Sequence, residues 1–322
     1  MITKEILRNV GNLRNELHYC NVLKDIFEEY PEIFNTFEDD LGYFKSAKTE
    51  VESLDIVVEF EKHVFIFEVK TGSSEGQNQT SKYTEKIKNL FPNRKHTLVF
   101  LTYLKEKAKD TSWVNMSHEE LYEVVKEFIK VGNDRMFDLY IETMPYVFDK
   151  INSDNQIIKH VAFNEEDDSD EVINRGKLKD IIQKRFLLCA YNELNLDYYF
   201  ILNKSHKKAN LCIVIKNFEY KGVTYRLSLS LQGGTFKISI ANEDYENSSL
   251  ENLSTELIEI LKGKFAGKNG YDRINPGRTK ERISCSKSIK KNYGKDFYKF
   301  SVKELSEILK EEIDFIVKTW NE

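Results

Sequence analysis

Two short runs of alternating apolar residues constrain the fold of this chain more than any other feature. LDIVVEF covers residues 54–60 and VFIFEV covers residues 64–69, and both are rich in β-branched and aromatic side chains. Runs of period two with this composition predict neighbouring strands, and the polar Glu61-Lys62-His63 between them predicts a tight turn. The chain is therefore expected to contain a β-hairpin in this region.

Three charged side chains interrupt the apolar hairpin near its open end, namely Asp55, Glu68 and Lys70. If a two-residue loop begins at Glu61, Asp55 lies opposite Glu68; if it begins one residue later, Asp55 lies opposite Lys70. A three-residue loop would instead place Asp55 opposite Val69 and separate the three groups. Two carboxylates and an ammonium at a strand end cost free energy unless something binds between them. Mg²⁺ is the expected ligand of this site, because it binds few carboxylates and completes its octahedral coordination with water and phosphate oxygens.

The residues around the hairpin predict an α/β sheet. Apolar residues at helical spacing precede it, from Leu13 to Phe27, and Glu16 lies at the edge of that stripe. After the hairpin, residues 77–90 predict a helix, and the continuous apolar run at 97–103 predicts a strand buried on both faces. Hairpin, crossover helix and buried strand together predict a mixed sheet flanked by helices.

A further helix is predicted from Ser117 to about Lys130, because Glu120, three residues after Ser117, completes a capping box. The pair His118-Glu119 resembles the opening of a zinc-protease HExxH motif, but Tyr122 stands at the second ligand position. The segment is therefore interpreted as a capped helix, and its histidine as a structural residue.

Beyond residue 175 the pattern changes to short strands. A helix is expected at residues 177–194, and helices at 250–261 and 302–320 are expected near the end of the chain. Between them lie four candidate strands joined by short turns, at residues 198–202, 211–218, 224–231 and 236–241. Strands in succession at this spacing predict an antiparallel meander.

An acidic run, NEEDDSDE at residues 164–171, separates the two patterns and predicts a solvated linker. The expected organisation is a first domain at residues 1–160, an acidic linker at 161–175 and a C-terminal α+β domain at 176–322. The C-terminal domain is expected to help select a substrate or partner.

Charge is distributed unevenly along the chain. The net charge is -5, which argues against a protein that coats nucleic acid in general, yet residues 262–299 hold 12 Lys and Arg against 3 Asp and Glu. Phe265, Tyr271 and Tyr293 are interleaved with these cations, a mixture suited to phosphate contact and base stacking. The expected substrate contacts in this segment are Arg273, Arg278, Lys280 and Arg282. The alternative is a charged loop that balances an acidic protein.

The remaining composition predicts an ordinary cytoplasmic protein. The start of the chain lacks the apolar core of a signal peptide, and no stretch approaches the roughly 18 apolar residues of a membrane span. The 4 cysteines lie far apart without metal-ligand spacing, so neither a zinc site nor a disulfide framework is expected.

The order of the charged residues resembles the PD-(D/E)XK nuclease superfamily. Asp55 stands on one strand, Glu68-Val69-Lys70 stands on the next, and QTSKY at residues 79–83 resembles the QxxxY motif of the RecB-like branch. Leucine precedes Asp55 where the motif usually has proline. The resemblance is confined to the first domain.

The resemblance implies a restriction-endonuclease-like fold and a hydrolase that cleaves nucleic-acid phosphodiester bonds, DNA more than RNA, with Mg²⁺ or Mn²⁺. It implies that the metal is held by Asp55, Glu68 and the carbonyl of Val69, and that Lys70 is catalytic. In this reading Lys70 holds the attacking water or neutralises charge on the phosphate oxygens.

The resemblance also extends to residues on the flanking helices. Glu16 resembles the first-helix glutamate that many members add to the metal site. Gln79 and Tyr83, four residues apart on one helix face, would line the substrate side. The alternative function is a catalytically silent nucleic-acid-binding module, or an effector activated by a partner within a defence or repair complex. A homodimer is expected if both strands of a duplex are cut.

Overall fold

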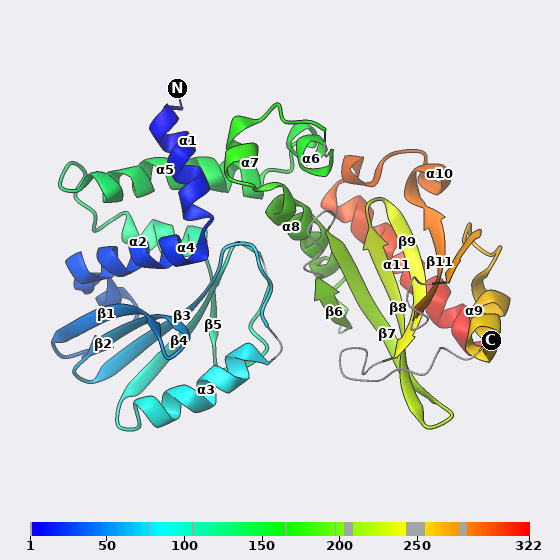
Figure 1. The fold of residues 1–322 in the computed structure, drawn as a ribbon, viewed down its shortest axis with the longest axis horizontal. Helices are drawn as coiled ribbons and strands as arrows, with labels where there is room; N and C mark the ends of the chain where they lie inside the picture. The colour runs from blue at the N-terminus through cyan, green and yellow to red at the C-terminus, as the bar shows by residue number, and fades with distance from the viewer. Residues whose placement is uncertain are drawn as a thin grey trace. The chain divides into compact units, whose positions relative to one another are not determined.

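The computed structural model describes residues 2–76, 78–104, 106–164, 166–196, 198–202, 209–242, 255–276 and 282–322. These residues form two compact units (Figure 1). Unit 1 comprises Met1–Ser153 and Glu165–Arg185, and unit 2 comprises Asp154–Asn164 and Phe186–Glu322. None of the helices in the described part of the chain has the length and apolar character of a transmembrane segment.

Unit 1 is built on a five-stranded mixed sheet. Its strands, in spatial order, are β1 (Phe44–Val51), β2 (Leu54–Phe60), β3 (His63–Lys70), β4 (Lys95–Thr102) and β5 (Val114–Ser117). β1, β2 and β3 pair antiparallel, whereas β3, β4 and β5 run parallel. The predicted hairpin and buried strand are thus confirmed. β1 and β5 were not predicted; β1, at the sheet edge, has the charged sequence FKSAKTEV, which obscures its strand pattern.

Helices cover both faces of this sheet (Figure 1). The helices of unit 1 are α1 (Lys4–Leu13), α2 (Glu16–Glu29), η1 (Pro31–Thr36), α3 (Gln79–Leu90), α4 (His118–Val125), α5 (Arg135–Asn152), α7 (Glu171–Arg175) and the first half of α8 (Lys179–Asn192). On one face, Phe27 of α2 stacks on Phe67 of β3 with ring centroids 5.3 Å apart. On the other, Ile87 of α3 packs in a cluster with Ile66. Because side chains alternate along β3, its two faces are buried by different helices.

The region of predicted helical spacing forms two helices, because the helix is interrupted between α1 and α2. The side chain of Asn15 accepts a hydrogen bond from the His18 N–H at 3.3 Å and caps α2. Glu16 is consequently the first residue of α2. The capping box at Ser117 is confirmed, although α4 ends at Val125 and not near residue 130.

The chain is divided differently from the predicted boundary at residues 161–175. α6 (Gln156–Phe163) belongs to unit 2, and α7 belongs to unit 1. Asp170, within the acidic run, accepts from the N–H groups of Val172 and Ile173, both at 3.0 Å. The acidic residues at this point therefore cap a helix whose apolar residues are buried, and they do not only form a solvated linker.

Unit 2 is built on a six-stranded antiparallel sheet. Its strands, in spatial order, are β10 (Arg273–Pro276), β11 (Arg282–Ser288), β9 (Thr235–Asn242), β8 (Val223–Gln232), β7 (Asn210–Tyr220) and β6 (Tyr199–Leu202). The predicted meander is confirmed as β6 to β9. β10 and β11 were not predicted, because they come from the basic segment.

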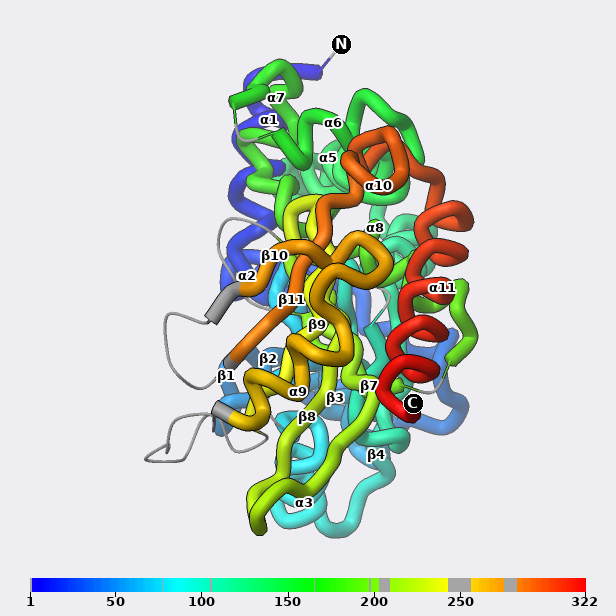
Figure 2. The backbone as a smooth tube through the Cα atoms, turned by 90° about the vertical axis from the view of Figure 1, so that its right-hand side faces the viewer, coloured from blue at the N-terminus to red at the C-terminus, as the bar shows by residue number. Residues whose placement is uncertain are grey.

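Helices of unit 2 pack beside this sheet (Figure 2). They are α6, the second half of α8, α9 (Thr255–Phe265), α10 (Ile289–Tyr293), η2 (Phe297–Lys299) and α11 (Val302–Asn321). Trp320 near the end of α11 meets Phe218 of β7 at 5.0 Å and stacks with Phe265 of α9 at 6.4 Å. Aromatic side chains thus join α11 both to β7 and to α9.

Candidate active site

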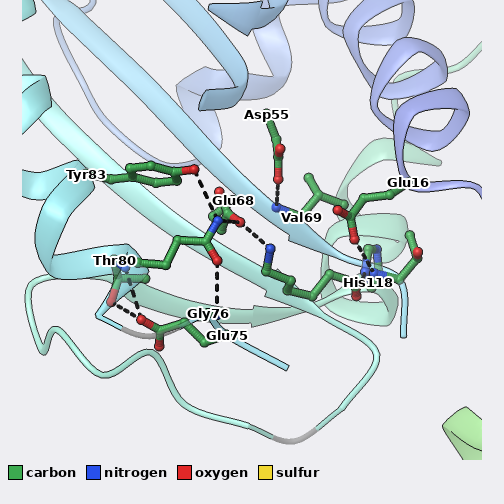
Figure 3. A network of polar contacts seen from close by, with 12 residues as sticks. Glu16, Asp55, Glu68, Val69, Glu75, Gly76, Thr80, Tyr83 and His118 are labelled. Atoms are coloured by element: carbon green, nitrogen blue, oxygen red, sulfur yellow. Dashed lines mark hydrogen bonds and ion pairs between the residues drawn. The ribbon is translucent and has the colours of Figure 1, made fainter. Parts of the chain in front are cut away.

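The charged residues of the hairpin meet at one end of β2 and β3 (Figure 3). Ile56 pairs with Phe67, and the loop between the two strands is two residues long. One residue further along, the same register places Asp55 opposite Glu68, which is the first of the predicted alternatives. The N–H of Val69 donates to Asp55 Oδ2 at 2.7 Å, so β3 itself orients the Asp55 carboxylate.

Glu68 is the centre of the polar contacts at this end of the sheet (Figure 3). Its side chain is 1% exposed, and its Oε1 forms a buried ion pair with Lys70. Gln79 Nε2 donates to the same Oε1 at 2.7 Å and to the Tyr83 hydroxyl at 3.1 Å. The Gly76 N–H donates to Gln79 Oε1 at 3.1 Å and fixes the amide orientation. The structure therefore brings Glu68 and Lys70 of the hairpin together with both residues of the predicted helix face.

Glu16 reaches the same site from the start of α2. The N–H of Thr71 donates to Glu16 Oε2 at 3.4 Å, and the Thr71 hydroxyl donates to the carbonyl of Arg14 at 2.9 Å. Burial raises the pKa of Glu16; Lys70 lowers it and Asp55 raises it, which places Glu16 within electrostatic reach of both groups. The predicted helix residue is thus part of the cluster.

Burial governs the protonation of this cluster. Burial and the neighbouring Asp55 raise the pKa of Glu68 to about 8, against the attraction of Lys70. Burial also raises the pKa of Asp55. Burial lowers the pKa of Lys70, but the surrounding carboxylates outweigh that effect and raise it. Three carboxyl groups therefore share one ammonium in a poorly hydrated space, where a second cation would be stabilising.

A divalent cation fits this donor set. Glu68 Oε2 is buried and has no hydrogen-bond partner, whereas Oε1 is bonded to two side chains. A bare carboxylate oxygen beside a second carboxylate is the donor chemistry that Mg²⁺ and Mn²⁺ take. Within the described ranges, no three His, Cys, Asp or Glu side chains are arranged to enclose an ion as they stand. Asp55 and Glu68 therefore offer a partial set, which water and substrate oxygens would complete.

The structure describes only part of the predicted substrate contacts in the basic segment. Arg273 begins β10 and is exposed, and Arg282 begins β11. Arg278 and Lys280 lie outside the described residues. Their predicted role in phosphate contact therefore stays a prediction.

Two of the three aromatic residues of that segment are buried and unavailable for base stacking, which corrects the prediction for these two. Phe265 and Tyr271 are fully buried, and Tyr271 stacks on Phe315 of α11 at 6.0 Å. Lys287, counted among the basic residues, is buried in an ion pair with Glu312. The reason is tertiary: α11 covers this segment with aromatic and acidic side chains that are distant in sequence.

Two residues that support the site were not among the predicted ones. His118 hydrogen-bonds to the carbonyl of Lys70, and Glu75 joins the start of α3 to the segment after β4 (Figure 3). Glu75 Oε1 accepts from the N–H and the hydroxyl of Thr80, at 3.0 and 2.7 Å, and its Oε2 accepts from the Lys109 N–H at 2.7 Å. No motif spacing marks Glu75, and the sequence pattern identifies His118 only as a structural residue at the start of a capped helix.

Glu75→Ala is expected to destabilise unit 1 by about 1–3 kcal/mol, because it leaves buried backbone N–H groups without acceptors. Urea denaturation followed by fluorescence measures the loss. Glu85→Ala, an exposed change on the neighbouring α3, serves as the control and should cost less than about 0.5 kcal/mol. Equal stability of the two variants would show that the contacts of Glu75 contribute nothing net.

Chemically, the site pairs the buried Glu68 carboxylate and the half-buried Asp55 carboxylate with the Lys70 ammonium, and α3 presents an amide and a phenol beside them. With a divalent cation on the carboxylates, this arrangement would suit an electrophile that carries negative charge, such as a phosphodiester, more than a neutral substrate. Comparisons of the chain with protein-family models, with curated proteins and with solved structures found no match.

Proposed function

We propose that this chain is a Mg²⁺- or Mn²⁺-dependent nuclease with a PD-(D/E)XK site on a restriction-endonuclease-like core, acting on DNA in preference to RNA. The observation that carries the proposal is the convergence of Asp55, Glu68 and Lys70 with Gln79 and Tyr83 at one end of the hairpin. Buried groups with shifted pKa values gather at functional sites more often than elsewhere. The mixed sheet with α2 and α3 on opposite faces is the architecture that this proposal requires.

Asp55, Glu68 and the carbonyl of Val69 would hold the cation. When bound, a divalent cation supplies Lewis-acid polarisation of the phosphate and lowers the pKa of water. The Val69 N–H keeps the Asp55 carboxylate aimed at this position. These residues would therefore bind the cation and fix its position, and the folded hairpin sets the spacing of the ligands before the cation binds.

Lys70 and Glu16 would act on the reacting groups. The Lys70 ammonium, which is paired with Glu68 in this structure, would donate a hydrogen bond to a phosphate oxygen as negative charge develops. The Glu16 carboxylate accepts a hydrogen bond from the attacking water and aligns it. Gln79 and Tyr83 contact the substrate from α3, and Gln79 also limits the orientations of Glu68.

The test is cleavage of supercoiled plasmid, single-stranded DNA and structured RNA in the presence of Mg²⁺, Mn²⁺ or EDTA. Wild type is expected to cut only with a divalent cation. Lys70→Ala and Asp55→Asn are expected to reduce the rate by roughly 10³-fold, since each removes several kcal/mol of transition-state stabilisation. Lys82→Ala, an exposed lysine on α3, is the matched control and should cut at the wild-type rate.

Other outcomes distinguish the alternatives. Cutting by Lys70→Ala at the wild-type rate would contradict the assigned site. Salt-sensitive binding of nucleic acid without cutting would favour the silent binding module. Cutting that begins only after a partner protein is added would favour the activated effector.

A further inference from the structure

His118, at the start of α4, lies against the end of β3 and against α2 (Figure 3). It is the first residue of α4, and its side chain is completely buried. Nε2 lies 3.1 Å from the carbonyl oxygen of Lys70, and Nδ1 lies 3.0 Å from the hydroxyl of Tyr19. Because a carbonyl only accepts hydrogen bonds, Nε2 carries the proton, and Nδ1 accepts from Tyr19.

The imidazole ring is held on its faces as well as at both nitrogens. It stacks on Tyr103 with ring centroids 3.9 Å apart and planes at 29°, and its ring meets Tyr19 at 4.8 Å with planes at 79°. Burial lowers the pKa of His118 to about 3, against the hydrogen bond to the Lys70 carbonyl. The ring is therefore neutral over the working pH range and does not serve as an acid or base.

The contacts of His118 join the elements that carry two site residues. Lys70 is the last residue of β3, and its carbonyl also accepts from the Tyr103 N–H at 3.3 Å. Tyr19 lies on α2, three residues after Glu16, and so shares a helix face with it. One imidazole thus bridges the end of β3 and the first turn of α2.

We propose that His118 is a positioning residue of this site, whose neutral imidazole fixes the end of β3 against α2 and so holds the Lys70 ammonium at Glu68. The role is separate from cation binding, because His118 contacts neither Asp55 nor Glu68 in the described structure. The activity readout rests on the proposed nuclease function, whereas the placement of Lys70 can be measured without it.

Three variants separate the hydrogen bond from ring packing. His118→Gln keeps an N–H donor near the position of Nε2, and His118→Phe keeps the ring but removes both hydrogen bonds. His63→Phe is the matched control, because His63 is a buried histidine at the other end of β3 that stacks on Phe65 and bonds to Thr97 at 2.8 Å. The melting temperature of each variant confirms folding; if His118→Phe folds poorly, His118→Asn takes its place.

The expected result is a loss in kcat without a change in substrate affinity. His118→Phe should lower kcat by about 10–100-fold, as outer-shell changes do, with KM for DNA within about twofold of wild type. His118→Gln should restore at least a third of the wild-type kcat, and His63→Phe should leave kcat within about twofold. Equal kcat for His118→Phe and His63→Phe would overturn the inference.

A spectroscopic readout is independent of turnover. In protein labelled with ¹⁵N-lysine, the Nζ signal of Lys70 is identified by its disappearance in Lys70→Arg. His118→Phe should shift or broaden that signal, whereas His118→Gln and His63→Phe should leave it in place. If wild type cleaves none of the substrates, the proposed function fails, and this signal alone decides the inference. An unmoved Lys70 signal in His118→Phe would overturn it.

Discussion

Replacement of Glu68 by Gln is expected to abolish cleavage while making the metal-free protein more stable at alkaline pH. Glu68 is a proposed cation ligand, so its loss should lower the cleavage rate by roughly 10³-fold. The same carboxylate is buried, and one of its oxygens has no partner. A neutral amide of the same shape removes the free energy of ionising it there.

The sign of the pH dependence follows from the direction of the pKa shift. Burial and Asp55 raise the pKa of Glu68 from 4.5 to about 8 in the folded protein. Stability from the bound proton is therefore complete below about pH 4.5 and is lost as the pH rises through 8. The opposite charge of Lys70 and the like charges of Glu16 and Asp55 are already part of this balance. At about 1.4 kcal/mol per pKa unit, the gain of Glu68→Gln at pH 9 is on the order of 2–4 kcal/mol, and it should vanish near pH 5.

Trp113 makes the measurement specific to unit 1. The chain has 2 tryptophans, and Trp113 packs in the apolar cluster beneath α3. In a Trp320→Phe background, urea denaturation followed by Trp113 fluorescence at pH 5, 7 and 9 reports unit 1. Glu85→Gln, exposed on α3, is the control and should show no such trend. A Glu68→Gln variant that is no more stable than wild type at pH 9 would contradict the free-energy cost assigned to this carboxylate.

Cation addition completes this test. Mn²⁺ at about 100 times its Kd should stabilise the wild type by about 2.7 kcal/mol, because it binds only the folded site. Glu68→Gln should respond little, since one of the two carboxylates is gone. An equal response of both proteins would place the cation elsewhere.

The hairpin was predictable because its pattern is local, but its register was not. Period-two alternation identifies both strands, yet Glu61, Lys62 and His63 are all polar and allow several loops. The structure begins β3 at His63, whose ring stacks on Phe65 at 4.6 Å and whose Nε2 bonds to the hydroxyl of Thr97 on β4. A contact with a strand more than thirty residues away thus supports the loop length that places Asp55 opposite Glu68.

The basic segment at residues 262–299 could not be predicted in the same way, because its properties depend on tertiary contacts. Its local charge is real, but an acidic residue within the segment and two on α11 pair with several of its cations. Lys291 pairs with Asp272 at 2.6 Å, and Lys295 pairs with Glu304 at 2.9 Å. Lys287 is buried because α11 brings Glu312 to it. Sequence composition therefore predicts the local positive charge, but it does not predict which of these cations are buried or paired in the fold.

Glu312→Ala is expected to destabilise unit 2 by about 3–5 kcal/mol, which is more than most single substitutions cost. Glu312 is 1% exposed and accepts hydrogen bonds from the hydroxyls of Tyr271 and Tyr293 at 2.6 and 2.7 Å. It also forms an ion pair with Lys287, which is 2% exposed. Removing the carboxylate leaves a buried ammonium without its counter-charge, which is the costly way to break such a pair.

The remaining contacts of Lys287 do not replace that charge. Its ammonium keeps the carbonyl of Asn269 at 3.2 Å and the ring faces of Tyr271 and Tyr293, with centroids at 5.0 and 5.3 Å. Each such cation–π contact contributes about 0.5–2 kcal/mol, less than the solvation that a buried ammonium loses. The double variant Lys287→Met with Glu312→Leu should therefore be more stable than Glu312→Ala, because it removes both charges.

Trp320 reports unit 2 in a Trp113→Phe background, since its ring stacks within that unit on Phe265. Urea denaturation followed by this fluorescence should show an early transition for Glu312→Ala. Glu311→Ala, which removes an exposed carboxylate one residue earlier, is the matched control and should stay within about 0.5 kcal/mol of wild type. If the two alanine variants unfold at the same urea concentration, the buried pair contributes no net stability. In that case the remaining contacts of Lys287 would balance its charge without Glu312.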